Sequence, residues 1–261
     1  MSLKYALADK LKRMVPLCKP QWRAWRKEIK ERLFYLRVKN RVVPFVFNGK
    51  KYRYLAHRYN HTSHNERSVE LPIALDYLKR HQGKQILEIG NVIGHYIDIS
   101  HPVIDKYEKW PGVLNVDIAD FTPSCKYDLI ISISTFEHIG CDENRYAKNG
   151  DFNADQRALL SAIKHTQSLV APGGVFLMTA PLGYNPFFDH QISGNGLGMT
   201  NIWFLKRVSK NNHWQQVPYE EVQGIRYSAP DYPWANGLVV AEYVRPLGAP
   251  NLQASQNDPV V

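Results

Sequence analysis

Apolar residues in the first 41 positions recur every three or four residues, which is the spacing of one face of an α-helix. Two sets share a face in this way: Leu3, Leu7, Leu11 and Met14, and then Trp22, Trp25, Ile29, Leu33 and Leu36. Lysine and arginine occupy the positions between them, and Pro16 and Pro20 separate the two sets. We predict that residues 1–41 form an arm of two basic amphipathic helices.

Residues 42–84 combine an alternating pattern with a helical one. Apolar residues alternate from Val42 to Leu55 around Asn48-Gly49, which predicts a short β-hairpin with a tight turn. The stretch Ser63–Glu66 has the form of a capping box, and it precedes an apolar run that extends to Leu78. We therefore expect a hairpin and a lead-in helix that cover the site of the next domain.

Apolar runs separated by loop and helix signals begin at Gln85, and this pattern is typical of a mostly parallel sheet. Seven candidate strands follow: Ile86–Ile89, Pro102–Asp105, Val113–Asp117, Tyr127–Ser134, Val175–Ala180, Gln216–Val222 and Leu238–Val244. A helix is expected from Ala154 to Val170. We predict an α/β domain over residues 85–245 and a disordered tail over the polar residues 246–261.

Charge is distributed unevenly along the chain. The formal net charge is +9, yet residues 1–58 alone hold 17 Lys+Arg and 3 Asp+Glu. A basic arm on a mildly acidic body favours an anionic partner for the arm, such as a membrane surface, nucleic acid or an acidic glycan. The arm either packs on its own domain or rests on an anionic membrane face.

The cysteines and the apolar stretches bear on the compartment. Cys18, Cys125 and Cys141 form no C-x-x-C pair, so the sequence predicts neither a zinc knuckle nor a disulfide framework. Charges interrupt the first apolar stretch, and prolines and glycines interrupt the uncharged residues 169–188, so neither a secretory signal nor a membrane span is expected. We expect a cytoplasmic protein, peripheral to the inner membrane if the arm binds it.

The candidate chemistry begins with an acid and a glycine turn after the first strand of the sheet. Glu88 can accept hydrogen bonds from a cationic amino group, and Gly90 and Gly94 allow the backbone to approach a ligand closely. Dinucleotide-binding folds also use a glycine turn, but no G-x-G-x-x-G pattern follows here. A nicotinamide-dependent oxidoreductase is therefore disfavoured.

The stretch from Ile86 to Asn185 resembles class I S-adenosylmethionine-dependent methyltransferases. Six pieces match in the family's order: Glu88-x-Gly90-x-x-x-Gly94, Val103–Asp105, Val116–Phe121, Tyr127–Ser132, Glu137–Ile139 and Leu169–Gly174. Asn65–Arg67 and Gly183–Pro186 also resemble uncharacterised bacterial members of glycan-cluster type. The family implies an α/β fold with a Rossmann-like methyltransferase sheet, mostly parallel with an antiparallel last strand, and helices on both faces.

The resemblance implies S-adenosyl-L-methionine as the cofactor. In such proteins the residues that match Glu88, Gly90 and Gly94 hold its methionine end. The expected cofactor-binding set is Glu88, Gly90, Asn91, Gly94, Asp105, Asp117, Ile118 and Ser134. Val92 stands where many members have a glycine, and only residues 95–101 separate the glycine turn from the next strand, so the first helix is expected to be truncated.

Three residues of this set are assigned to the adenosyl part. Asp105 matches the acid that accepts both ribose hydroxyls, a task that suits a carboxylate with two acceptor oxygens. Asp117 and Ile118 match the pair that contacts adenine. An alternative register makes Asp117 the ribose ligand.

The candidate catalytic base is His138, which borders the transferred methyl group if the fold is right. It could equally be a structural histidine of the loop after the fourth strand. Tyr184 and Asn185 follow the fifth strand, where loops line the crevice of a parallel sheet, so both are candidate substrate residues.

A segment before the lead-in helix offers a further acceptor-site candidate. Tyr59, Asn60, Asn65 and Arg67 can form a lid or contact the acceptor, although a capped helix start would explain the same stretch. Asn65 is the residue assigned to the substrate. The spacing of the histidines at 57, 61 and 64 could suit a metal, but no cysteine accompanies them and no acid that would orient a ligating histidine, so no metal is expected.

These observations predict methyl transfer from S-adenosylmethionine to a hydroxyl or amine of a small molecule or glycan precursor. The alternative is a non-catalytic or RNA-binding protein that retains the methyltransferase fold and uses the basic arm as its working surface. Nucleic acid is the less expected partner, because the charge of the catalytic body is slightly acidic.

Overall fold

The structure is a computed structural model that describes residues 43–141, 155–229 and 233–248, with isolated positions between residues 22 and 36. Apart from those positions, the predicted arm lies outside the described residues, and so does most of the predicted tail. The expected contact of the arm with a membrane or a nucleic acid stays a prediction. Within the described residues, no helix is long and apolar enough to span a bilayer.

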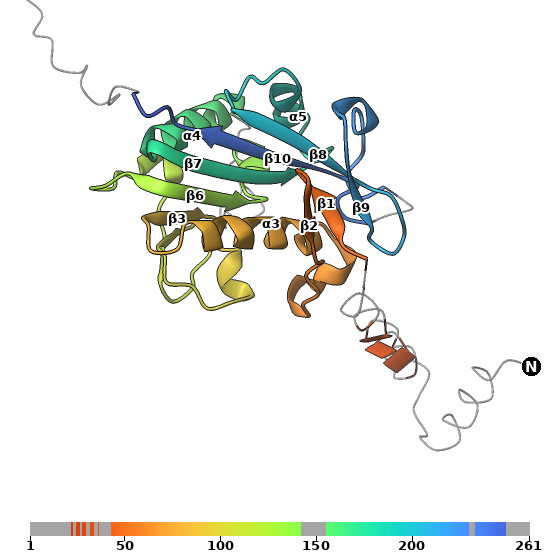
Figure 1. Ribbon diagram of the computed structural model, residues 1–261. Helices are drawn as coiled ribbons and strands as arrows, with labels where there is room; N and C mark the ends of the chain where they lie inside the picture. The colour runs from red at the N-terminus through yellow and green to blue at the C-terminus, as the bar shows by residue number, and fades with distance from the viewer. Residues whose placement is uncertain are drawn as a thin grey trace, which may run out of the picture.

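One eight-stranded sheet forms the centre of the protein (Figure 1). Its strands, in spatial order, are β5 (Val113–Leu114), β4 (Val103–Ile104), β3 (Ile86–Ile89), β6 (Tyr127–Ile133), β7 (Val170–Pro181), β10 (Gly237–Val244), β8 (Asn201–Arg207) and β9 (Trp214–Val217). The first five run parallel, and β10 pairs antiparallel with β7. The predicted fold class, a mostly parallel α/β sheet with an antiparallel last strand, is confirmed.

Two details of the predicted strands were wrong. The seven residues of β8 were not predicted, and they lie between β10 and β9. The expected strand Gln216–Val222 is instead the end of β9, followed by the 3₁₀ turn Tyr219–Glu221. Pro218 separates the two, and proline cannot donate to a strand ladder.

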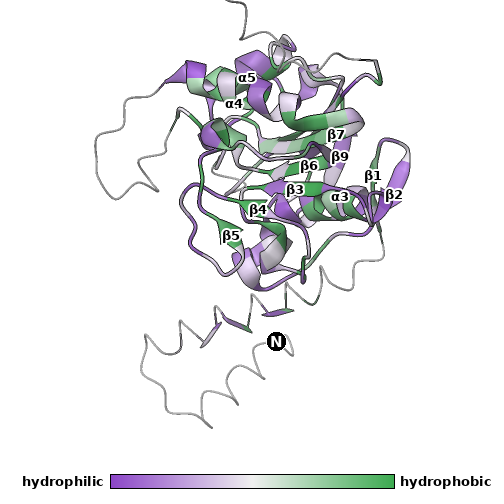
Figure 2. Cartoon of the chain, turned by 90° about the vertical axis from the view of Figure 1, so that its left-hand side faces the viewer, coloured by the Kyte–Doolittle hydropathy of each residue, from purple (hydrophilic) through white to green (hydrophobic). Residues whose placement is uncertain are grey.

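Helices cover both faces of the sheet, as expected. The helix α3 (Arg67–Arg80) lies on one face, and α4 (Gln156–Leu169) and α5 (Pro186–Ser193) lie on the other (Figure 1). Figure 2 shows the hydrophobic strands of the sheet between these layers. Each strand alternates its side chains between two cores, because successive residues of a strand point to opposite faces.

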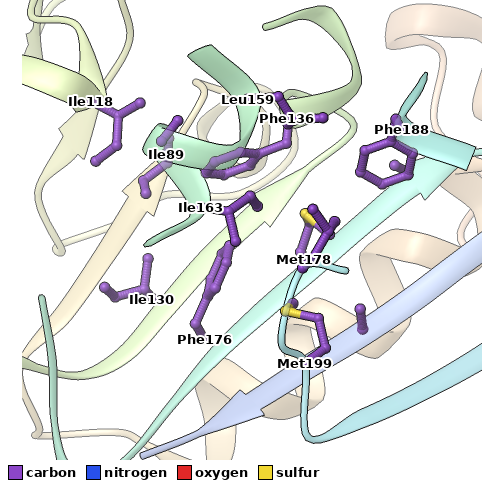
Figure 3. Close-up of a cluster of buried hydrophobic side chains, with 14 of the residues drawn as sticks. Ile89, Ile118, Ile130, Phe136, Leu159, Ile163, Phe176, Met178, Phe188 and Met199 are labelled. Atoms are coloured by element: carbon purple, nitrogen blue, oxygen red, sulfur yellow. The ribbon is translucent and has the colours of Figure 1, made fainter. Parts of the chain in front are cut away.

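The two cores therefore draw on neighbouring positions of the same strands. The core under α4 and α5 includes Ile89, Ile130, Phe136, Phe176 and Met178 (Figure 3). The core under α3 includes Leu129, Ile131, Ile133, Leu177 and Val240. Because α3 and the sheet share one of these cores, α3 is part of the same packed body as the sheet.

The predicted hairpin is present. It consists of β1 (Phe45–Phe47) and β2 (Lys50–Tyr52), which pair antiparallel around Asn48 and Gly49. Both turn residues have positive φ, 46° and 74°, as a tight two-residue hairpin turn requires. Phe45 and Phe47 are buried and belong to the core under α3.

The predicted capping box before α3 is wrong. Ser63 belongs to the 3₁₀ segment Tyr59–His64, which ends before the helix. The helix begins at Arg67, whose backbone N–H donates to Oδ1 of Asn65 at 3.1 Å. Glu66 precedes the helix without a side-chain capping bond. The asparagine side chain thus supplies the local acceptor that was expected from serine.

The connection from β3 to β4 contains only the short 3₁₀ turn Ile93–His95, so the expected truncation of the first helix is confirmed. Ile93 is buried and packs in the same core as α3. The layer that a crossover helix would supply after β3 is thus provided by a helix that precedes it in the sequence.

Candidate functional site

A cleft of about 610 Å³ opens at the carboxyl ends of β3, β4, β5 and β6. Its lining includes seven of the residues predicted for cofactor binding or catalysis: Gly90, Asn91, Asp105, Asp117, Ile118, Ser134 and His138. Parallel strands all end at the same edge of the sheet, and ligands of open α/β sheets bind in the crevice outside those ends. The remaining predicted residues do not line the cleft: Glu88, Gly94, Asn65, Tyr184 and Asn185.

Glu88 organises the glycine turn from beneath. Its side chain is fully buried. One carboxylate oxygen accepts hydrogen bonds from the backbone N–H groups of Val92 (2.8 Å) and Ile93 (2.7 Å), and the other lies 3.0 Å from Nε2 of His101. These contacts fix the conformation of the glycine turn. The expected contact of Glu88 with a ligand amino group stays a prediction.

The glycine turn has room for backbone but not for a side chain. Gly90 has φ +85°, and a Cβ atom there would lie 2.2 Å from Oγ1 of Thr135. Gly94 is less restricted, because its nearest neighbour, Oδ1 of Asn91, would be 3.2 Å from an added Cβ. The cleft floor at Gly90 therefore depends on glycine, in close contact with the loop after β6.

Asp105 fixes the loop after β4 and reaches the glycine turn. Its Oδ1 accepts hydrogen bonds from the backbone N–H groups of Tyr107 (2.8 Å) and Glu108 (2.7 Å). Its Oδ2 accepts from the N–H of Asn91 at 3.1 Å. A carboxylate offers about four lone-pair sites, so Asp105, which lines the cleft, keeps accepting capacity.

Asp117 lies at the next strand end along the cleft. It precedes the 3₁₀ turn Ile118–Asp120 and accepts a hydrogen bond from the N–H of Ala119 at 3.0 Å. Its Oδ2 lies 2.9 Å from Nζ of Lys106. Burial opposes ionisation of Asp117, but the hydrogen bonds from Lys106 and Ala119 and the charge of Lys106 outweigh it, so the pKa of Asp117 is lowered. The buried side chain of Ile118 lies beside this carboxylate.

Ser134 ties the end of β6 to α3. It has a positive φ of 41°, and its Oγ donates to Oε1 of Glu70 at 2.7 Å. Thr179 of β7 donates to the same oxygen at 2.7 Å. The other oxygen of Glu70 accepts from Nη1 of Arg67 at 2.5 Å. The fully buried Glu70 therefore connects two strand ends to an arginine that lines the cleft.

His138 faces the cleft at the end of the 3₁₀ turn Phe136–His138. Its ring packs edge-on against Tyr184 at 4.9 Å between centroids, and Tyr184 packs in the same way against Tyr227 at 5.1 Å. Nε2 of His138 is 3.8 Å from Oε1 of the buried Glu137. Burial raises the pKa of Glu137 well above its usual value. Tyr184 thus borders the cleft indirectly, through His138.

Asn185 and Asn65 are engaged in local structure. Oδ1 of Asn185 caps α5 by accepting from the N–H groups of Phe187 and Phe188, and its Nδ2 donates to the carbonyl of Glu137 at 2.8 Å. Asn65 is buried, and its Nδ2 donates to the carbonyl of Asn60 at 2.7 Å. Their assignment to the acceptor stays a prediction, and the described contacts give them structural roles.

An aromatic cluster covers one side of the cleft. Tyr59 stacks on His95 at 4.4 Å between ring centroids, with an interplanar angle of 16°. Nε2 of His95 lies 2.8 Å from Oε1 of Glu108, which also accepts from Nδ2 of Asn91 at 2.9 Å. Tyr59, Asn60 and Arg67 of the predicted lid or acceptor segment line the cleft, and Asn65 does not, so the role of the segment stays a prediction. The contribution of His95 and Glu108 was not predicted.

The missed cleft residues carried only weak sequence signals. Lys106, Tyr107 and Glu108 directly follow the predicted acid Asp105, so their position near the strand end could have been predicted. Their contacts in the cleft depend on the conformation of the loop, which the sequence pattern does not indicate. The histidines at 57, 61 and 64 form no metal cluster in the part of the chain that the structure describes.

No protein-family model matches the chain, and no curated protein matches it. Among solved structures, it is similar to the N-methyltransferase NodS from Bradyrhizobium japonicum WM9 in complex with S-adenosyl-L-homocysteine, with 14% identity, 70% of this chain and 89% of that chain covered, and a TM-score of 0.41. A possible histamine N-methyltransferase from Thermotoga maritima shares 10% identity over 65% of this chain and 86% of that chain, with a TM-score of 0.36. Similarities at this level define neither a family nor an activity for the chain.

Proposed function

We propose that the protein is an S-adenosylmethionine-dependent methyltransferase that acts on a hydroxyl or amine of a small molecule or glycan precursor. The observation that carries the proposal is the cleft itself, where strand-end carboxylates and a glycine turn meet in the order that the sequence motifs require. Asp105 follows β4, Asp117 follows β5, and Gly90 follows β3, all at one edge of the sheet.

The residues present fit an adenosyl ligand. The cleft lies against Ile118, an apolar surface suited to a base, next to the ionised carboxylate of Asp117, which can accept from an exocyclic amine. Asp105 has accepting capacity left for ribose hydroxyls. At Gly90 a Cβ atom would collide with Oγ1 of Thr135, so the end of β3 leaves room only for glycine.

When bound, S-adenosylmethionine supplies an activated methyl group on a sulfonium, so the protein mainly has to orient the acceptor and exclude water. Ser134, Thr135 and His138 border the part of the cleft at the end of β6. We assign to His138 the role of taking the proton that an oxygen or nitrogen nucleophile loses, a role typically worth about 10²–10⁴ in rate. His138 lines the cleft, and its ring also packs against Tyr184.

Isothermal titration with S-adenosylhomocysteine tests the proposal. Wild-type protein is expected to bind, and Asp117→Ala is expected to bind more weakly. Absence of binding by the wild type, or unchanged binding by Asp117→Ala, would refute the site. The acceptor class is tested by mass spectrometry of metabolites and glycans from a strain that lacks the protein. A compound that is methylated on a hydroxyl or amine in the parent strain is expected to be unmethylated there.

A further inference from the structure

An apolar stripe with exposed leucines precedes the hairpin. The structure describes eight positions between residues 22 and 36, and all eight are helical. Five of them recur with the period of one helix face and form the apolar stripe: Trp22, Trp25, Ile29, Leu33 and Leu36. Leu33 is 62% exposed and Leu36 is 43% exposed. Packing of the arm on its own domain would bury these two leucines, so their exposure favours an external apolar partner.

Cations accompany the apolar stripe. Among the described helical positions, Arg26, Arg32 and Glu28 are exposed. Residues 22–46 together hold 8 Lys+Arg and 2 Asp+Glu, whereas residues 59–261 hold 16 Lys+Arg and 21 Asp+Glu. A helix with tryptophan and leucine on one face and basic residues on the other has the composition of helices that lie in the plane of a membrane interface. The charge asymmetry would turn the basic end of the chain toward an anionic surface and the acidic body away from it.

The hairpin extends this combination of apolar and basic side chains onto the folded domain. Val43 is 66% exposed and Val46 is 47% exposed. In β1 the flanking Phe45 and Phe47 are buried, so the alternation of the strand directs Val46 away from the core. Val46 lies opposite the exposed Lys51 of β2, and directly opposite residues of a hairpin share one face. The outer face of the hairpin therefore presents a valine beside a cation.

A second exposed valine meets this face from a distant part of the chain. Val46 lines a groove of about 800 Å³ between β1 and β9, and the groove lining also includes Val208, which directly follows β8 and is 47% exposed. The buried rings of Phe45 and Trp214 also line the groove. Exposed apolar surface that gathers in one place marks an interaction site more often than scattered apolar residues do.

The exposed aliphatic side chains distinguish between the anionic partners that the charge allows. A nucleic acid would engage the lysines and arginines through its phosphates and would leave the leucines and valines in water. A bilayer surface accommodates both kinds of side chain, because apolar groups enter the boundary between headgroups and acyl chains while cations meet anionic headgroups. We propose that the apolar stripe, Val43, Val46 and Val208 together bind the surface of a bilayer that contains anionic phospholipids. This binding does not depend on the proposed methyl transfer.

Sedimentation of the full chain with vesicles tests the proposal. The chain is expected to bind vesicles of phosphatidylcholine and phosphatidylglycerol at least about tenfold more tightly than vesicles of phosphatidylcholine alone, because each cation near an anionic surface adds attraction. The affinity for the mixed vesicles should fall as salt is added, since salt screens exposed charges. Failure to bind the mixed vesicles, or equal affinity for the two kinds, would overturn the proposal.

Substitution of the exposed leucines tests the apolar stripe. Leu33→Glu combined with Leu36→Glu is expected to weaken binding to the mixed vesicles at least about tenfold, because two apolar anchors are replaced by charges that anionic headgroups repel. The matched control combines Leu114→Glu with Leu247→Glu, which places the same charges on leucines that are 56% and 84% exposed elsewhere. The control should keep most of the affinity. Equal losses in the two double variants would refute the apolar stripe as the binding element.

Substitution of the exposed valines tests the share of the folded domain. Val46→Glu combined with Val208→Glu is expected to weaken binding to the mixed vesicles at least about fivefold relative to the same leucine control. Both side chains are exposed, so the urea midpoint should stay close to that of the wild type. Unchanged vesicle binding in this variant would overturn the part of the proposal that assigns the hairpin and the groove to the membrane surface.

Two further measurements separate the proposal from its rivals. Binding of polyuridylate without binding of the mixed vesicles would overturn the membrane surface in favour of nucleic acid. Vesicle binding is measured without S-adenosylhomocysteine, and the leucine and valine variants are expected to bind that compound as the wild type does. A chain that binds vesicles but not S-adenosylhomocysteine would therefore refute the proposed function and support the membrane surface.

Discussion

Nζ of Lys106 lies 2.9 Å from Oδ2 of Asp117, so an ion pair joins the loop after β4 to the loop after β5 at the rim of the cleft. The pair helps to keep Asp117 ionised against the cost of its partial burial. It also leaves Oδ1 directed at the backbone of the turn that carries Ile118. The proposed adenine site is thereby charged and positioned before any ligand enters.

Replacement of Asp117 by asparagine is expected to weaken S-adenosylhomocysteine binding about tenfold or more, because hydrogen bonds to charged groups are worth about 1.5–3 kcal/mol. The pKa of Asp117 in the folded protein is lowered below its usual value of about 3.9. The contribution of the ionised carboxylate to ligand affinity, and to stability, is therefore fully present above about pH 3.9 and is lost only as the pH falls through the lower folded pKa. The affinity ratio between wild type and variant should thus be constant from about pH 8 to about pH 5. Calorimetry at several pH values measures it, with Asp120→Asn as the control. A ratio that falls between pH 8 and pH 6 would count against the assignment.

Substitutions of Glu88 separate a loop-organising role from direct ligand contact. Glu88→Ala should lower the free energy of unfolding by roughly 2–3 kcal/mol, because the buried N–H groups of Val92 and Ile93 lose their acceptor. Glu88→Gln keeps a carbonyl oxygen and should retain most of the stability and most of the S-adenosylhomocysteine binding. Urea unfolding and calorimetry provide the two readouts. Full stability with lost binding in Glu88→Gln would instead indicate a direct charge contact with the ligand.

Gly90→Ala is expected to abolish detectable binding of S-adenosylhomocysteine. The added Cβ would collide with Oγ1 of Thr135, and alanine is strained at φ +85°. The double variant with Thr135→Ala removes the collision but not the backbone strain, so it should recover part of the binding. Gly83→Ala, at φ +80° with open space around it, is the control for strain alone. Wild-type affinity in Gly90→Ala would show that the turn does not form the floor of the ligand site.

Asn185→Ala is expected to lower the free energy of unfolding by about 0.5–2 kcal/mol, the usual cost of losing an N-cap. The side chain caps α5 and donates to the carbonyl of Glu137, so its removal is expected to lower stability and not ligand binding. Binding of S-adenosylhomocysteine should be unchanged. Asn185→Ser keeps a capping oxygen and should recover most of the stability. Unchanged stability together with lost methylation of the acceptor would support the original assignment of Asn185 to the substrate.

Much of the sheet could be predicted because its central strands are buried on both faces and are therefore continuous apolar runs. The strand β8 escaped prediction because it sits nearer the sheet's edge, where Asn201 and Lys206 break the apolar run. The turn Asn48–Gly49 was predictable because its two residues have the backbone preference that the turn demands.

The candidate site was predictable only where a residue's position along the strand decides its place. Gly90, Asp105 and Asp117 line the cleft because each follows a strand of the same parallel set. The orientation of side chains could not be read in this way. Asn185 precedes Pro186 at the start of α5, where its side chain serves as the N-cap.

The helix that carries Arg67 and Glu70 is synthesised well before its partners. Tyr77 donates to Glu242, and the backbone N–H of Ala235 donates to Glu66, across 165 and 169 positions of the chain. The entropic cost of closing such long loops comes before the free energy that these contacts contribute, which favours slow folding. The contacts that hold α3 on the sheet are therefore complete only when β10, the last strand that the structure describes, joins the sheet. A C-terminal truncation that removes β10 is expected to weaken ligand binding at a cleft that β10 does not itself line.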